Sequence, residues 1–184
     1  MYRFVILICL PFFLYGESGK LVYVVDGDTV VLQGKNGNII CHMGEIDTPE
    51  ITLNTKLKKE MKECSFTKNE FMKIGQLSYT HAKTLLKVGQ TYNYEILGYT
   101  RNKNPICKFS LPKGLHVEIN PVFDEAMVGR GYALPYIINA KPQRAKLLLR
   151  LAKNAKEQKL GLWKEHYGLM QCLVEHRYSL RSFR

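Results

Sequence analysis

The chain has 184 residues, 46% of them hydrophobic and only seven of them proline, and it carries a net charge of +11. This length suits one domain with a buried core, and the composition excludes an intrinsically disordered chain. A fixed positive excess attracts polyanions over long distances, which makes nucleic acids candidate partners. Removal of residues 1–18 would take away one base, Arg3, and one acid, Glu17, so the remaining chain would also carry +11.

The N-terminal segment predicts export. Residues 1–18 contain Arg3, an apolar run over residues 4–15 and then Gly-Glu-Ser, the arrangement of a secretory signal peptide. The run is too short for a comfortable membrane span, and an uncleaved anchor is the alternative. We expect an exported protein, either periplasmic, at the cell surface or secreted, with no stable membrane association after cleavage.

Four cysteines remain after export. An even number of cysteines in an oxidising compartment predicts two disulfides, for which three pairings are possible. Buried free thiols are the alternative, and the spacing lacks the close pairs of a zinc site. The four are Cys41, Cys64, Cys107 and Cys172.

The N-terminal half reads as a three-stranded meander. Gly27 permits the first turn, and Asn36-Gly37 is a hairpin signal between β-favouring runs. Residues 52–67 are rich in lysine and are predicted to form a solvated, mobile insertion. The β-favouring runs predict strands over residues 20–25, 29–32 and 39–46.

The C-terminal half alternates helix and strand signals. Asn120 followed by Pro121 marks the start of a short helix that runs through Val128. The basic, aromatic residues 166–184 form a tail whose contacts the sequence does not indicate. Apolar periodicity predicts helices over residues 68–88 and 142–159, and strands over residues 90–97 and 106–111.

Four carboxylates gather near the ends of two of these strands. Asp26 and Asp28 differ by two positions, so they share a face if the backbone is extended. Asp47 and Glu50 flank a Thr-Pro turn. Such a cluster repels itself unless a cation compensates it. Either motif alone fits an ordinary turn, but the two together indicate a site for a cation.

These motifs resemble those of the staphylococcal nuclease family, which are Asp-Gly-Asp-Thr, a strand, and then Asp-[Thr/Ala]-Pro-Glu. Residues 128–133 resemble the family's Val-x-x-Gly-x-Ala segment, and residues 152–163 resemble its closing helix with a Gly-Leu-Trp end. The resemblance implies an α+β, mainly β fold over residues 19–165. That fold is a five-stranded OB-fold-type Greek-key barrel with three added helices, in agreement with the order of the predicted elements.

The resemblance also implies roles for individual residues. Asp28, Asp47 and the Thr48 carbonyl would bind calcium, and Glu50 would orient or deprotonate the attacking water. Asp26 would hold the turn behind these ligands. The expected activity is hydrolysis of phosphodiester bonds in DNA and RNA with low sequence specificity, by a monomer. Contacts to the nucleic acid are expected from Lys103, Asn104 and Tyr136.

The positively charged side chains expected at the site depart from the family pattern. The family's first arginine position holds His42, and the second falls on Asn104, with Arg101 three residues earlier in the same turn. Histidine lacks the bidentate fork of arginine and is only partly charged near neutrality. We expect His42 and Arg101 to act as the catalytic cations. The alternative is a catalytically weakened OB-fold protein that only binds nucleic acid; a module that binds proteins through its lysine-rich insertion has little support.

The resemblance also narrows the disulfide pairing. The third and fifth strands are neighbours in a barrel of this type, which would join Cys41 to Cys107. Cys64 and Cys172 would then tie the insertion to the C-terminal tail.

Overall fold

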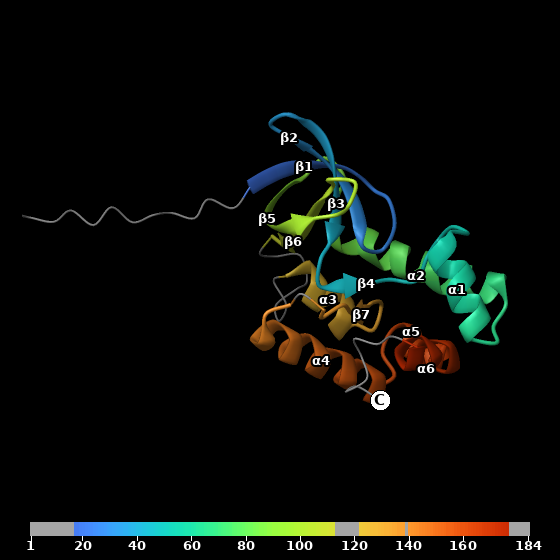
Figure 1. Cartoon of the computed structure of the whole chain (residues 1–184). Coiled ribbons are helices and arrows are strands. Elements are labelled where there is room, and N and C mark those ends of the chain that lie inside the picture. Colours follow the sequence, from blue (N-terminus) through green and yellow to red (C-terminus); the bar gives the residue numbers. More distant parts are fainter. Residues whose placement is uncertain (1–16, 113–121, 139, 177–184) are drawn as a thin grey trace, which may run out of the picture.

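The computed structural model describes residues 17–112, 122–138 and 140–176 (Figure 1). Five strands close a barrel in the order β1-β2-β3-β6-β5, which confirms the predicted five-stranded barrel. β3 and β6 pair in parallel, and the other neighbours pair antiparallel. The strands are β1 (Glu17–Val24), β2 (Thr29–Gly34), β3 (Gly37–Met43), β5 (Thr91–Tyr99) and β6 (Pro105–Ser110).

The larger of two hydrophobic cores fills the barrel and extends to helical residues packed against it, such as Ala126 and Leu148. Burial alternates along β5 and β6, so every second side chain points inward. Tyr92 and Tyr94 meet Phe109 inside the barrel, and the Cys41–Cys107 disulfide crosses from β3 to β6. This disulfide has the pairing expected from the barrel order.

The predicted strand over residues 39–46 is wrong in its last part. β3 ends at Met43, and the chain leaves the barrel at Gly44 and Glu45 before forming β4 (Ile46–Asp47). β4 pairs with β7 (Leu134–Pro135), outside the barrel. In Figure 1 these two short strands lie between the barrel and the helices formed by residues 142–176. The break carries Asp47 away from the barrel wall.

The three predicted helices are present as α2 (Lys68–Leu85), α3 (Phe123–Gly129) and α4 (Pro142–Glu157). α2 begins with a capping box, in which Thr67 and Glu70 exchange hydrogen bonds. The cap expected at Asn120 and Pro121 lies outside the described residues, and α3 begins after Val122 without a side-chain cap.

The predicted insertion is solvated at Lys58, Lys59 and Lys62, which are exposed, but it also contributes to a hydrophobic core. Its central part is α1 (Thr55–Glu63), which begins at Asn54, whose side chain accepts a hydrogen bond from the Leu57 N–H (2.9 Å). Leu57 is fully buried, and Cys64 at the end of the helix is bonded to Cys172. The apolar residues Leu57, Met61 and Cys64 recur at helical spacing, a signal that the lysine content masked.

A second hydrophobic core lies outside the barrel. α5 (Leu162–Glu165) and α6 (Tyr167–His176) add Trp163 and the buried face of α6 to it. Leu57 of α1 and Phe71 of α2 belong to the same cluster. Residues 167–176, whose contacts the sequence left open, are therefore integrated into the fold, and the Cys64–Cys172 disulfide joins α1 to α6.

The N-terminal end of β1 overlaps the expected leader. Glu17 and Ser18 pair with Tyr94 and Asn93 of β5, and the Tyr94 hydroxyl donates to Glu17 Oε2 (2.8 Å). Cleavage after residue 18 stays a prediction, and it would remove the first two residues of this strand. In the described part of the chain, no helix is long and apolar enough to cross a membrane.

Two glycines let the carboxylate turns approach α2 closely. A Cβ on Gly75 of α2 would lie 2.1 Å from the Glu50 backbone oxygen. A Cβ on Gly27 would lie 2.6 Å from Ser78 Oγ and 2.8 Å from the Thr48 side chain. Because backbone atoms cannot move aside as a flexible side chain can, Gly75 fixes how near the Glu50 turn comes to α2.

We predict that Gly75→Ala destabilises the protein. Alanine favours a helix over glycine by about 1 kcal/mol, but the clash with Glu50 forces a backbone shift that typically costs on the order of 1–3 kcal/mol or more. Urea denaturation measures the net change. Gly98→Ala is the matched control, since a Cβ there meets nothing within 4 Å; equal stabilities of the two variants would contradict the packing argument.

We also predict that Cys64→Ser/Cys172→Ser lowers the free energy of unfolding by on the order of 2–4 kcal/mol, because the bond closes a long loop in the unfolded chain. The sequence separation of the two cysteines is 108 residues. Urea denaturation of the oxidised wild type and the variant measures this loss. Four free thiols in the non-reduced protein would refute the pairing.

Candidate functional site

Asp28, at the start of β2, connects the two carboxylate motifs. Its backbone N–H donates to Asp26 Oδ1 (3.0 Å), so Asp26 holds the turn after β1. Its Oδ2 accepts hydrogen bonds from the N–H (2.7 Å) and the hydroxyl (3.0 Å) of Thr48. The turn before β2 and the turn after β4, which lie 20 residues apart in sequence, are thereby joined.

The surroundings of Asp28 disfavour a negative charge. Withdrawal from water raises the pKa of the Asp28 carboxyl to about 8, and the charges of Asp26 and Asp47 add to this effect. The Lys56 ammonium and the Thr48 N–H oppose it. A cation placed at this site would stabilise the ionised carboxylate.

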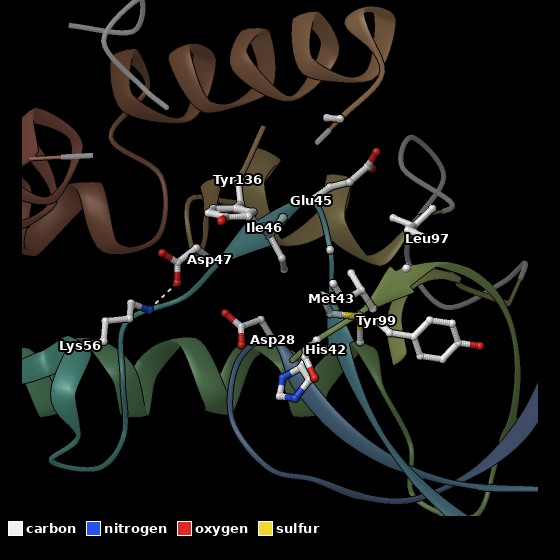
Figure 2. Close-up of a pocket in the computed structure, with 15 residues that line it drawn as sticks. Asp28, His42, Met43, Glu45, Ile46, Asp47, Lys56, Leu97, Tyr99 and Tyr136 are labelled. Atoms are coloured by element: carbon white, nitrogen blue, oxygen red, sulfur yellow. Dashed lines mark hydrogen bonds and ion pairs between the residues drawn. The ribbon is translucent and has the colours of Figure 1, made fainter. Parts of the chain in front are cut away.

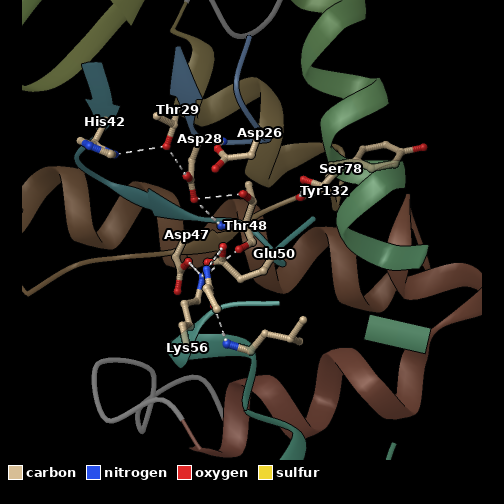
Figure 3. A network of polar contacts seen from close by, with 12 residues as sticks. Asp26, Asp28, Thr29, His42, Asp47, Thr48, Glu50, Lys56, Ser78 and Tyr132 are labelled. Carbon is tan, nitrogen blue, oxygen red and sulfur yellow. Dashed lines mark hydrogen bonds and ion pairs between the residues drawn. The ribbon is translucent and has the colours of Figure 1, made fainter. Parts of the chain in front are cut away.

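One lysine ammonium already lies among the predicted site oxygens. Lys56 Nζ, in the first turn of α1, donates to Asp47 Oδ1, to the Thr48 carbonyl oxygen (2.9 Å) and to Glu50 Oε1 (2.7 Å), as Figure 3 shows. The second oxygen of Glu50 accepts from Asn54 Nδ2 (2.6 Å). The motif Asp-Thr-Pro-Glu therefore converges on a single cation.

Sequence reasoning did not single out Lys56, which contacts three of the candidate site oxygens. It was one of several lysines in a segment interpreted as solvated, and composition does not distinguish them. The available signal was its position, six residues after Glu50 and two residues after the helix cap Asn54. A lysine in a first helical turn faces the positive end of the helix dipole, so it requires nearby carboxylates to compensate.

The donor set fits calcium. Carboxylate and backbone carbonyl oxygens are the ligands that calcium prefers. Asp47 and the Thr48 carbonyl already coordinate a positive group, and Asp28 is hydrogen-bonded to Thr48 from the other side. These three residues are the ones predicted as metal ligands, and the structure brings them together.

A cavity of about 530 Å³ opens beside these carboxylates (Figure 2). Asp28 and Asp47 lie at its polar side, and Leu97, Tyr99 and Tyr136 contribute apolar and aromatic surface. Tyr99 and Tyr136 are exposed, so a flat ring could stack on either. Among the described residues that line the cavity, Lys56 is the only lysine or arginine.

Glu45 also lines this cavity, but its charge is balanced elsewhere. Its Oε2 accepts from Arg144 Nε (2.9 Å) and Nη2 (2.6 Å), and Arg144 also pairs with Glu125. Both carboxylates are almost fully buried. This ion pair joins α4 to the bend after β3, so Glu45 is not one of the proposed cation ligands.

His42 lies at the cavity, but it faces the Asp28 side of the site. Its Nδ1 lies 3.2 Å from Thr29 Oγ1, and that hydroxyl lies 3.2 Å from Asp28 Oδ1. A threonine hydroxyl has one proton, so when it donates to Asp28 the histidine Nδ1–H must donate to it. His42 is thus linked to the acidic cluster through Thr29.

The turn expected to carry the second cation lies beside the cavity. Thr100 lines it, whereas Arg101 and Lys103 are exposed and do not. Asn104 closes the turn, with its N–H donating to Thr100 Oγ1 (3.1 Å). The structure therefore brings His42 and Tyr136 to the cavity, and leaves Arg101, Lys103 and Asn104 on an adjoining turn.

A second cluster of residue types that can bind metals lies at the C-terminal end of α1. Cys64 Sγ, Cys172 Sγ and a His176 ring nitrogen lie within 4.8 Å of one another. The two cysteines are joined in a disulfide, which removes the thiolates that a metal would need. We assign this cluster a structural role.

The comparison with known families agrees with this geometry. The family described as staphylococcal nuclease homologue matches residues 41–165, more than half of the chain. The match includes the Asp47–Glu50 motif, and Asp28, which precedes it, is joined to that motif by the Thr48 hydrogen bonds. No curated protein matches this sequence. The chain belongs to the staphylococcal nuclease homologue family.

Proposed function

We propose that this protein is an exported, calcium-dependent nuclease that hydrolyses phosphodiester bonds of DNA and RNA with low sequence specificity. The observation that carries the proposal is the convergence of Asp47, the Thr48 carbonyl and Glu50 on one cation position, with Asp28 bonded to Thr48. The family is one of nucleases and is generally calcium-dependent, which supports the same conclusion.

Each residue of the site has a role in this proposal. Asp28, Asp47 and the Thr48 carbonyl hold calcium, which when bound neutralises charge that grows on the phosphate oxygens. Asp28 also holds Thr48 in place by accepting hydrogen bonds from its backbone N–H and its hydroxyl. Glu50 orients the attacking water and accepts its proton, which it can do once one of its oxygens is free.

Low sequence specificity follows from the kinds of contact that the cavity offers. Exposed tyrosines such as Tyr99 and Tyr136 stack on any base, since every base has an aromatic face. The net charge of +11 attracts the phosphate backbone regardless of sequence. A single polypeptide supplies every residue of the proposed site, which is consistent with an active monomer.

The second candidate function is nucleic-acid binding without cleavage. His42 and Asn104 stand where the family has arginines, and the Lys56 ammonium is bound to the carboxylates of Asp47 and Glu50. A binder gains nothing from three carboxylates that repel phosphate, however, whereas a metal-dependent nuclease requires them. This comparison favours the enzyme.

We predict that Asp28→Asn abolishes calcium-dependent cleavage of plasmid and single-stranded DNA, lowering the rate by roughly a hundredfold or more, because a charged ligand is lost. The same variant should be more stable than wild type in chelator at pH 8. The folded wild type keeps a proton on Asp28 up to a pKa of about 8, against an ordinary value of 3.8, so its stability falls as pH rises between these values. Asparagine does not titrate.

Thermal melts in chelator from pH 5 to 9 test the stability part of this prediction. The pKa of Asp124 is also raised, to about 7, by burial and by Glu45, but this group is common to both proteins and cancels in the comparison. The gain of Asp28→Asn over wild type should grow with pH and level off above about pH 8. Normal digestion by both Asp28→Asn and Asp47→Asn would show that the site is misassigned.

We predict that His42→Ala lowers the rate of calcium-dependent cleavage and His42→Arg raises it, because arginine supplies a permanent charge with two parallel donors. Arg101→Ala should have a small effect, since Arg101 does not line the cavity. Initial rates on single-stranded DNA at saturating calcium distinguish the two residues. A silent His42→Ala together with a severe Arg101→Ala would assign the phosphate contact to the turn instead.

A further inference from the structure

The contacts of Lys56 have a consequence for metal binding. An ammonium group has three protons, and Lys56 Nζ has three acceptors within the site: Asp47 Oδ1, the Thr48 carbonyl and Glu50 Oε1. Two of these acceptors are proposed calcium ligands, and the third is the proposed base. The ammonium and a calcium ion therefore compete for the same oxygens and cannot occupy the position together.

The position of Lys56 allows its side chain to leave without unfolding the helix. The start of α1 is fixed by the Asn54 cap and by the buried Leu57, and its end is fixed by the Cys64–Cys172 disulfide. The Lys56 side chain is one-third exposed (33%) and reaches the site from the edge of the cavity. A rotation about its flexible side-chain bonds is enough to expose the ammonium to solvent.

We propose that Lys56 is a built-in competitor for the metal: it occupies the acidic site in the calcium-free protein, and calcium binds by displacing it. This proposal rests on the calcium site of the proposed function. Displacement exchanges one positive charge for two among Asp26, Asp28, Asp47 and Glu50, which favours calcium once its concentration is high enough. Lys56 thus sets the calcium concentration at which the site fills.

The same contact restrains the proposed base. While Lys56 is in place, Glu50 Oε1 accepts from the ammonium and Oε2 accepts from Asn54, so both carboxylate oxygens are engaged. Departure of Lys56 frees Oε1 for a water molecule. Metal binding and release of the base are therefore one event, and nucleic acid that arrives without calcium meets a restrained site.

The first test measures calcium binding by titration calorimetry on wild type, Lys56→Met and Lys58→Met. Methionine keeps much of the length of the side chain and removes the charge. If the lysine holds the site in about 90% of molecules, its removal should tighten calcium binding about tenfold. Lys58 is exposed on the same helix, so Lys58→Met controls for the loss of a general positive charge and should bind calcium as wild type does.

The second test needs no substitution in α1. Acetylation of wild-type lysines at limiting reagent, read by peptide mass spectrometry, should show Lys56 protected in chelator and reactive in calcium. Lys58 should react equally in both. Calcium binding to Lys56→Met that is no tighter than to wild type, or reactivity of Lys56 that does not change with calcium, would overturn the proposal.

The outcomes also separate this inference from the proposed function. Tighter calcium binding by Lys56→Met without cleavage of any nucleic acid would uphold the competition and refute the nuclease. Cleavage of nucleic acid, together with calcium binding that Lys56→Met leaves unchanged, would uphold the nuclease and refute the competition. Failure of both wild type and Lys56→Met to bind calcium would overturn the competition and leave Lys56 as a permanent structural ion pair.

Discussion

The mutual repulsion of carboxylates at one end of the barrel is the constraint on which the site depends. Burial disfavours ionisation of Asp28, and the negative charges of Asp26 and Asp47 strengthen this effect. Only a cation or hydrogen-bond donors can offset the cost of ionising Asp28. The structure supplies both kinds of compensation. Thr48 donates twice to Asp28, and the Lys56 ammonium is shared by Asp47 and Glu50. A fold that assembles such a cluster is less stable than one without it, a cost typical of functional sites.

The surrounding structure holds the cluster together against that repulsion. The bend at Gly44 and Glu45 carries Asp47 off the barrel, and the Glu45–Arg144 ion pair ties the bend to α4. The absence of a side chain at Gly75 lets the Glu50 turn lie on α2. α1, which a disulfide joins to α6, carries Lys56, whose ammonium reaches the carboxylates.

The sequence predicted the barrel and singled out the residues of the candidate site because those signals are local. Alternating apolar residues and turn glycines specify strands, and the two acidic motifs follow directly from strand ends. The sequence mispredicted what depends on tertiary contacts. The break of the third strand results from pairing between β4 and β7, which are far apart in the chain. The lysine-rich segment was expected to be solvated because its buried residues, such as Leu57, are few. Its helix is stabilised by a core to which α2, β7, α4, α5 and α6 also contribute.

Composition could not identify Lys56 as the lysine that contacts the carboxylates, because this contact also depends on the tertiary structure. All seven residues over 56–62 are charged or apolar in a pattern that fits an ordinary surface helix, and only the fold distinguishes Lys56 from Lys58 and Lys59. His42 and Asn104 occupy the positions where the family pattern has arginines. The positive charge in the cavity instead comes from a residue that follows the Asp-Thr-Pro-Glu motif.

Asp28, Asp47 and the Thr48 carbonyl are proposed to form a cation site, and a crystal structure of the protein grown with calcium would test this proposal. We predict an ion about 2.3–2.6 Å from oxygens of Asp28 and Asp47 and from the Thr48 carbonyl, with water completing its shell. The Lys56 ammonium should then lie outside the site. A fully calcium-saturated crystal in which Lys56 still contacts Asp47 and Glu50, with no ion among these oxygens, would contradict the account.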